Sequence, residues 1–178
     1  MIAVSAKHGT RLEVSSPFRC YDFGTLPYGL NTVNAAWVGG RGPREDCDVF
    51  WDMAPHAIDL CNMFIRGACA SACISGETLK LEYDDNCISG ETLKLEYDDN
   101  SVANILVHND KRDRNERLVS CYGQGWDANF DFSKMQTYGQ HEPLRLMVGA
   151  FLAKYRDSWL SVRDGLEVVR VLEMAHAH

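Results

Sequence analysis

The stretch FWDMAPHAIDL, residues 50–60, decides the predicted fold because it places a carboxylate and an imidazole on one apolar helix. Asp52 and His56 are four residues apart, so they share a helix face and can contact one small molecule together. An imidazole exchanges protons near neutral pH, and the carboxylate beside it can hold a second hydroxyl. A structural alternative also fits. Asp52 then caps the helix through the amide of Ala54, since Pro55 belongs in a first turn and has no N–H.

The pattern D-x-x-x-H-x-x-D-L over residues 52–60 resembles the signature of the Gfo/Idh/MocA family, named after glucose–fructose oxidoreductase and inositol dehydrogenase. Three further stretches are similar to the same family. Residues 1–19 resemble the last helix and strand of its nucleotide-binding domain, and residues 95–107 resemble a strand pair of its substrate domain. Residues 161–177 resemble the family's closing helix.

This resemblance implies an α+β fold, with a predominantly antiparallel open sheet that carries helices on one face. Residues 1–19 would be a remnant of the nucleotide-binding domain, and residues 20–178 a substrate and oligomerisation domain. A length of 178 residues with 46% hydrophobic content suits a core of this size. Periodicity predicts helices at residues 1–8, 53–66, 144–156 and 162–176, strands at 11–15 and 32–38, and three or four strands between 77 and 133.

An exact tandem duplication interrupts this pattern, because residues 73–86 read CISGETLKLEYDDN and residues 87–100 repeat them without a change. Two units are too few for a solenoid fold. Each copy predicts one strand, since leucine and tyrosine alternate with polar residues before an Asp-Asp-Asn turn. Only one copy can occupy the family's strand position before residues 102–107. The other must be looped out, add a strand or pair with a second chain.

The resemblance assigns roles to a few residues. His56 would be the catalytic group that transfers a proton, and Asp52 would hold a substrate hydroxyl. Trp37 and Arg41 are weaker candidates for lining the substrate pocket. Asp59 either orients His56 or is a surface carboxylate. If the site is retained, Asp52 should govern the pKa of His56 and raise it, because a carboxylate favours the imidazolium.

The dinucleotide fingerprint of the family is missing from these 178 residues, and so is its catalytic lysine. The single glycine string that fits, residues 123–128, follows a predicted strand and precedes another, so it lacks the helix N-terminus that holds a pyrophosphate. We interpret this string as a turn between strands. The resemblance implies NAD or NADP in a full-length member, whereas we expect no cofactor to bind this chain alone.

The composition of the chain narrows the classes of partner and of binding site that we expect. A net charge of −7 argues against nucleic-acid or anionic-membrane partners, and no apolar run is long enough to span a bilayer. The seven cysteines lack paired metal-ligand spacing, so they predict free buried thiols and no metal site. We interpret His176 and His178 as frayed surface residues. The expected location is the cytoplasm.

Two functions remain open. The chain is either a truncated NAD(P)-dependent sugar or polyol oxidoreductase that retains its substrate-side motif, or a non-catalytic self-associating domain. In both cases we expect a homo-oligomer that associates through the open sheet face. Exchange of strands between the molecules is one form that such an oligomer can take. A small sugar or polyol is the expected ligand of the first alternative. Whether the chain is an enzyme stays uncertain, and we expect no catalysis by this chain alone.

Overall fold

A computed structural model describes residues 17–24, 29–39, 46–83, 86–109, 116–132, 134–135, 143–152 and 162–177. It confirms the α+β class, with one six-stranded sheet in the order β2-β3-β4-β1-β5-β6. β1 and β4 run parallel, and every other neighbouring pair is antiparallel. The elements are η1 (Pro17–Cys20), β1 (Leu30–Gly39), α2 (Val49–Phe64), β2 (Cys69–Tyr83), β3 (Asn86–Tyr97), β4 (Val102–Asn109), β5 (Glu116–Gly123), β6 (Trp126–Asp131), α3 (Pro143–Leu152) and α4 (Val162–His176).

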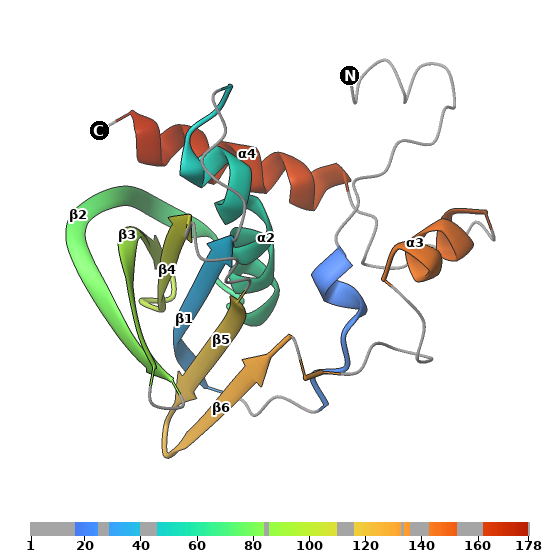
Figure 1. The fold of residues 1–178 in the computed structure, drawn as a ribbon, viewed down its shortest axis with the longest axis horizontal. Helices are drawn as coiled ribbons and strands as arrows, with labels where there is room; N and C mark the ends of the chain where they lie inside the picture. Colours follow the sequence, from blue (N-terminus) through green and yellow to red (C-terminus); the bar gives the residue numbers. More distant parts are fainter. Residues whose placement is uncertain are drawn as a thin grey trace.

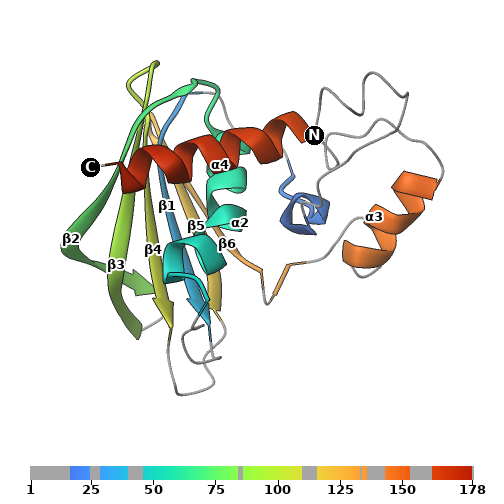
Figure 2. The ribbon, with the colours of Figure 1, turned by 90° about the horizontal axis from the view of Figure 1, so that it is seen from above.

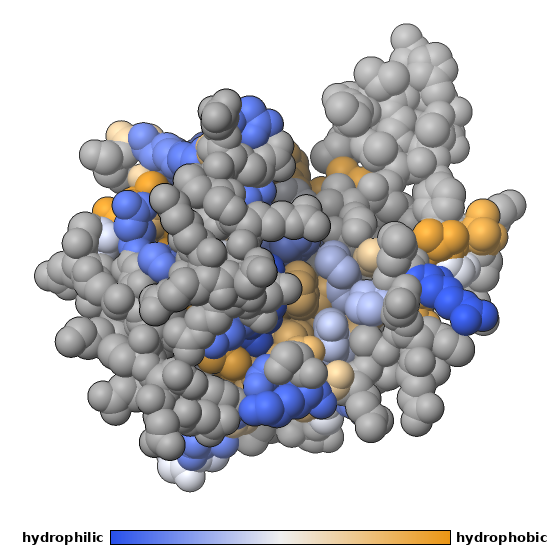
Figure 3. Space-filling view, in the orientation of Figure 1, coloured by the Kyte–Doolittle hydropathy of each residue, from blue (hydrophilic) through white to orange (hydrophobic). Residues whose placement is uncertain are grey.

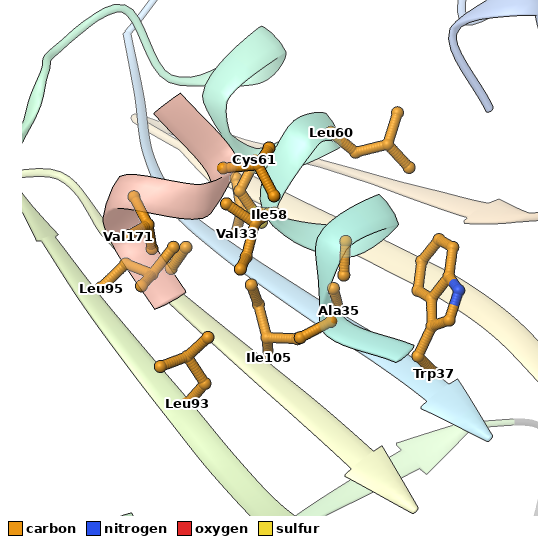
Figure 4. Close-up of a cluster of buried hydrophobic side chains, with 14 of the residues drawn as sticks. Val33, Ala35, Trp37, Ile58, Leu60, Cys61, Leu93, Leu95, Ile105 and Val171 are labelled. Carbon is orange, nitrogen blue, oxygen red and sulfur yellow. The ribbon is translucent and has the colours of Figure 1, made fainter. Parts of the chain in front are cut away.

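Two helices, α2 and α4, cover one face of the sheet (Figures 1 and 2). Successive strand residues alternate between the two faces, so every second side chain of the central strands meets these helices. Val33 of β1 and Ile105 of β4 lie with Ile58 of α2 and Val171 of α4, and all four side chains are fully buried (Figure 4). The predicted helix remnant at residues 1–8 and strand at 11–15 lie outside the described residues.

Helix α2 begins earlier than the sequence predicted. Asp48 is its N-cap, and the Asp48 carboxylate accepts hydrogen bonds from the backbone N–H groups of Phe50 and Trp51 at 2.8 and 3.1 Å. The alternative in which Asp52 caps the helix is therefore wrong, since Asp52 lies inside the first turn. A carboxylate at either position satisfies free N–H groups, so only the path of the chain distinguishes them.

Helix α4 has the predicted bounds but a different buried face. Its buried side chains are Val168, Val171, Leu172 and Ala175, which recur at helical spacing. The helical periodicity of residues 162–176 predicts that Leu166, Val169, Leu172 and Ala175 face inward, yet Leu166 and Val169 are 57% and 39% exposed. Leucine and valine occur on both faces of this helix, so periodicity alone did not fix its rotation.

Helix α3 stands apart from the sheet and packs against η1 (Figure 2). Met147 of α3 and Cys20 of η1 form a small buried cluster of their own. On the outward side of the helix, Val148 and Leu152 are exposed, and Figure 3 shows hydrophobic atoms over this region. Apolar side chains therefore lie on both sides of this helix: Met147 meets η1, whereas Val148 and Leu152 stay exposed.

The two copies of the duplication form adjacent antiparallel strands. The first copy continues β2 beyond residue 72, and the second forms β3. β3 also pairs with β4 from Glu91↔Val107 to Glu96↔Val102, so the second copy occupies the strand position next to β4. A short turn at residues 98–101 joins β3 to β4. Placing the first copy there instead would open a loop of fourteen more residues, which costs entropy.

The glycine string at residues 123–128 is a turn between strands, as predicted. β5 ends at Gly123, β6 begins at Trp126, and Gly125 adopts a φ of 77° that favours glycine. No helix follows this turn.

The sheet face opposite α2 and α4 also carries an apolar strip. Ala36, Val38, Leu106 and Leu118 form a second cluster, and each is no more than 7% exposed. Tyr122 lies on the same face and is 39% exposed. The single chain therefore already removes most of this strip from solvent.

A buried arginine ties three elements of the fold together. The Arg19 guanidinium of η1 donates to both carboxylate oxygens of Asp59 on α2, at 2.9 and 2.5 Å. It also donates to Asp164 in the first turn of α4 at 2.7 Å. The Arg19 and Asp59 side chains are 8% and 9% exposed, whereas Asp164 is 40% exposed. Asp59 therefore carries the buried part of this ion network.

We expect Asp59→Ala to lower the free energy of unfolding by about 3–5 kcal/mol, because it leaves the buried Arg19 charge without its bidentate partner. Asp164→Ala is the matched control, and we expect a loss of about 1 kcal/mol or less because water screens that pair. Urea unfolding followed by circular dichroism measures both changes. Equal losses in the two variants would contradict the assignment.

A second ion pair joins the ends of α2 and α4. Nε2 of His176 lies 2.9 Å from an Asp48 carboxylate oxygen, and its Nδ1–H donates to the Leu172 carbonyl at 2.8 Å. His176 is therefore a fixed contact, and its interpretation as a frayed residue is wrong. The Leu172 hydrogen bond and the Asp48 carboxylate raise the pKa of His176. Both ring nitrogens have acceptors, which favours the imidazolium.

We expect the pKa of His176 to lie above 6.5 and to fall in Asp48→Asn, as read by NMR titration. Asparagine keeps the N-cap oxygen, so helix content serves as the internal control. Because the folded-state pKa is raised, the stability contributed by His176 is complete below pH 6.5 and is lost as pH rises through the folded-state value. A His176 titration identical in both proteins would contradict the pairing.

Candidate functional site

The candidate site is built on α2, which carries Asp52 in its first turn and His56 one turn later. The two side chains share a side of the helix, as their spacing predicted, and both are partly buried. The groups that influence the pKa of His56 or contact its ring do not include Asp52. They are Asp59 on the same helix and Arg117 of β5, together with the aromatic ring of Phe18.

An aromatic cluster encloses one side of His56. The Phe18 ring from η1 meets the imidazole edge to face, with 5.1 Å between ring centroids. Phe18 also contacts Trp37 of β1 at 4.9 Å and Phe132 at 5.2 Å in the same edge-on manner. Edge-to-face contacts of this kind stabilise aromatic clusters beyond the area that they bury. The imidazole therefore faces a rigid apolar wall.

This environment keeps the imidazole neutral. Burial is the largest influence and lowers the pKa of His56; the carboxylate of Asp59 opposes this shift, and the Arg117 charge adds to it. The rise expected from Asp52 is wrong, because desolvation of the ring outweighs the attraction of a nearby carboxylate. A neutral imidazole at neutral pH can accept a proton from a hydroxyl group.

Trp37 lies beneath the site and does not present a face to solvent, since it is 1% exposed. The Arg117 guanidinium carbon lies 5.6 Å from the Trp37 ring centroid, which is cation–π geometry. Arg117 also donates to the Val38 carbonyl at 2.5 Å and to the Glu116 carbonyl at 2.9 Å. These contacts fix the indole in place. In this position Trp37 can support the aromatic wall from below.

Sequence reasoning missed Phe18 and Arg117 as neighbours of His56. Arg117 does carry a usable signal. It lies two residues before Val119 and four before Cys121 in β5, so the three side chains share one face of the sheet, and Val119 and Cys121 are fully buried on the helix-covered face. A strand drawn through this alternation would have predicted an arginine that points inward. Phe18 carries no such signal, because η1 reaches α2 only in the folded chain.

Asp59 has a defined place. It is a buried carboxylate and not a surface one, and the Arg19 guanidinium donates to both of its oxygens. Its negative charge still acts on His56 and opposes the lowering of the imidazole pKa that burial causes. Asp59 therefore connects the ion network of the fold to the electrostatics of the site.

The remaining predictions about the site concern Arg41, a metal ion and the cysteine thiols. Arg41 lies outside the described residues. Within the part of the chain that the structure describes, no three histidine, cysteine or carboxylate side chains come close enough together to hold a metal ion. The thiols of Cys20, Cys61, Cys69 and Cys121 are free and buried, as predicted, whereas those of Cys47 and Cys73 are free but half-buried and exposed, respectively.

The glycine string at residues 123–128 does not form the phosphate cradle of a dinucleotide site. It joins two strands, so no helix N-terminus points backbone N–H groups at a phosphate there.

None of the described helices is both long enough and apolar enough to cross a membrane.

Solved structures of oxidoreductases share this fold. A protein described as an oxidoreductase, from Magnetospirillum magnetotacticum, superposes with a TM-score of 0.72 at 16% identity. The superposition covers 98% of this chain and 66% of that protein's chain. UDP-N-acetylglucosamine 3-dehydrogenase from Acidithiobacillus ferrooxidans gives 0.73 at 16% identity, covering 99% and 64%. The 3-ketoreductase KijD10 from Actinomadura kijaniata, in complex with TDP-benzene and NADP, gives 0.57 at 15% identity, covering 98% and 63%.

These similarities confirm the fold predicted from the sequence, and the chain spans about two thirds of the length of each of the three proteins. No protein-family model matches the sequence, and no curated protein matches it.

We expect NMR titration to give His56 a pKa below 6.5, and we expect Asp52→Asn to leave that pKa unchanged. Because the folded-state pKa is lowered, the stability contributed by the neutral ring is complete above pH 6.5 and is lost as pH falls from 6.5 through the folded-state value. Asp59→Asn is the contrasting variant and should lower the pKa further. A His56 pKa above 6.5 that falls in Asp52→Asn would restore the original expectation.

Proposed function

We propose that this chain, which has the fold of the Gfo/Idh/MocA oxidoreductases, carries the substrate-binding part of an NAD(P)-dependent sugar or polyol oxidoreductase. The observation that carries the proposal is a neutral, partly buried imidazole, His56, held against an aromatic wall one helical turn from a carboxylate. This pairing suits a polyhydroxylated ligand, because His56 accepts one hydroxyl proton and Asp52 accepts a second hydroxyl hydrogen bond.

The aromatic wall supports a sugar ligand in a second way. Sugar rings present apolar C–H faces as well as hydroxyl groups, and specific sites combine apolar walls with a few placed polar groups. Phe18 supplies such a wall beside His56, and Trp37 with Arg117 holds it from beneath. Two of the structurally similar proteins are a UDP-N-acetylglucosamine dehydrogenase and a ketoreductase with a TDP compound, so a nucleotide-linked sugar is a reasonable probe.

The dinucleotide would bind to a part of the enzyme other than these described residues. The glycine string at residues 123–128 lies between two strands and offers no phosphate cradle, so we derive no hydride step from it. In this proposal the chain contributes substrate binding and proton transfer at His56, and turnover requires a nucleotide-binding partner domain. The six free thiols suit a reducing compartment such as the cytoplasm.

Binding measurements test the proposal. We expect UDP-N-acetylglucosamine or myo-inositol to shift the NMR signals of His56 in a saturable manner, while NAD and NADP alone show no useful affinity in calorimetric titration. His56→Ala and Asp52→Asn should each weaken the sugar probe, by about tenfold for a lost hydrogen bond to a charged or polar partner.

Glu173→Gln is the matched control, because Glu173 is exposed on α4 and takes no part in the site. It should leave sugar binding unchanged. If neither sugar probe perturbs His56 up to millimolar concentration, or if all three variants bind equally, the substrate-site proposal fails. The non-catalytic alternative would then be the better description.

A further inference from the structure

The outer edge of β2 has no neighbouring strand among the described residues. β2 runs for fifteen residues at the end of the sheet, and within the described part of the chain it pairs with β3 alone (Figure 1). Its register against β3 shifts between Cys69 and Ser71 and between Ser75 and Leu79. Proteins commonly protect an edge strand by keeping it short, by charged side chains such as lysine, by proline, by β-bulges, or by covering it with another element. β2 has no proline and one lysine, Lys80. Cys73 and Ile74 are exposed along it.

Beyond the sheet, the β2–β3 hairpin continues as a two-stranded ribbon. The pairing of β3 with β4 stops at Glu91, yet β2 and β3 stay paired from Leu79↔Gly90 to Tyr83↔Asn86. This distal ribbon has no third strand among the described residues. A two-stranded ribbon is at best marginally stable in water, so a further strand would stabilise it.

The duplication accounts for this ribbon. Sixteen residues separate Ser75 from its partner Thr92, and one copy of the repeat accounts for fourteen of them, which leaves two. Those two are Gly-Glu, and glycine at the first position suits a two-residue hairpin turn. With one copy removed, the pairs from Ser71↔Glu96 to Ser75↔Thr92 can therefore remain, and the hairpin closes without its extension.

The geometry points to a second copy of this chain as the partner of that edge. We propose that β2 pairs with β2 of another molecule, antiparallel and about a two-fold axis. The repeat is already shown to suit such pairing, because its first copy pairs antiparallel with an identical sequence in β3. A two-fold axis places identical segments opposite each other in the same antiparallel sense.

This surface differs from the open sheet face, which we expected from the sequence to carry the oligomer. The apolar strip on that face is already buried within one chain, so it gains little from a partner. The β2 edge instead gains backbone hydrogen bonds along its length. The two surfaces can be tested separately in the same protein.

Light scattering on the full chain, from micromolar to hundreds of micromolar, should report a species of twice the 20.0 kDa mass. Deletion of residues 73–86 removes one copy and should give a folded monomer, with circular dichroism and thermal melting as the check on folding. Ile74→Lys places a charge on the exposed edge and should weaken the dimer by about tenfold. Gln124→Lys adds the same charge at an exposed turn and should not.

Tyr122→Glu charges the open face and should leave the mass unchanged. The proposal is overturned if the full chain is a monomer throughout, if the single-copy protein associates as strongly as the full chain, or if Tyr122→Glu dissociates the dimer while Ile74→Lys does not. If the deletion protein does not fold, the contrast between Ile74→Lys and Gln124→Lys decides alone.

Discussion

The ion network around Arg19 is the constraint on which the helical layer depends. One guanidinium on η1 reaches α2 through Asp59 and α4 through Asp164, so three elements distant in the sequence share one charge. A charge this deeply buried is tolerated only while its partners hold it. The position of η1 is therefore fixed to both helices, and η1 in turn supplies Phe18 to His56 and packs against α3.

The same helices hold two histidines whose pKa values are shifted in opposite directions. His56 lies against aromatic rings, and desolvation lowers its pKa. His176 lies at the end of α4, where the Leu172 carbonyl and Asp48 raise its pKa. Their contributions to stability have opposite slopes with pH, because the folded state releases a proton from one ring and takes up a proton on the other. Neutral His56 is the state that proton acceptance requires.

The fold and the duplication have separate consequences. The sheet with α2 and α4 matches oxidoreductase structures at low identity, which fixes the architecture and leaves the ligand to be tested. The repeat lengthens one hairpin at the edge of that sheet, at the opposite end from β6 (Figure 2). Because the base of the hairpin keeps its register, the extension changes what the protein can pair with while the core stays as it is.

The sequence by itself determined the class of fold, the spacing of Asp52 and His56 on one helix, and the turn at Gly123 to Trp126. These features are local, since helix period, strand alternation and glycine conformation act over a few residues. It did not determine the rotation of α4, because apolar residues occur on both sides of that helix. The sequence also could not decide whether Asp48 or Asp52 caps α2, because aspartate is a good N-cap residue at both positions.

Only the tertiary structure decided the partners and charge states. Arg19 meets Asp59 across 40 residues and Asp164 across 145, while His176 meets Asp48 across 128. The direction of the His56 pKa shift depends on rings and charges from η1 and β5, and no window around residue 56 contains them. Desolvation and ion pairing sum over every neighbour in space, so they are properties of the packed chain and not of its local sequence.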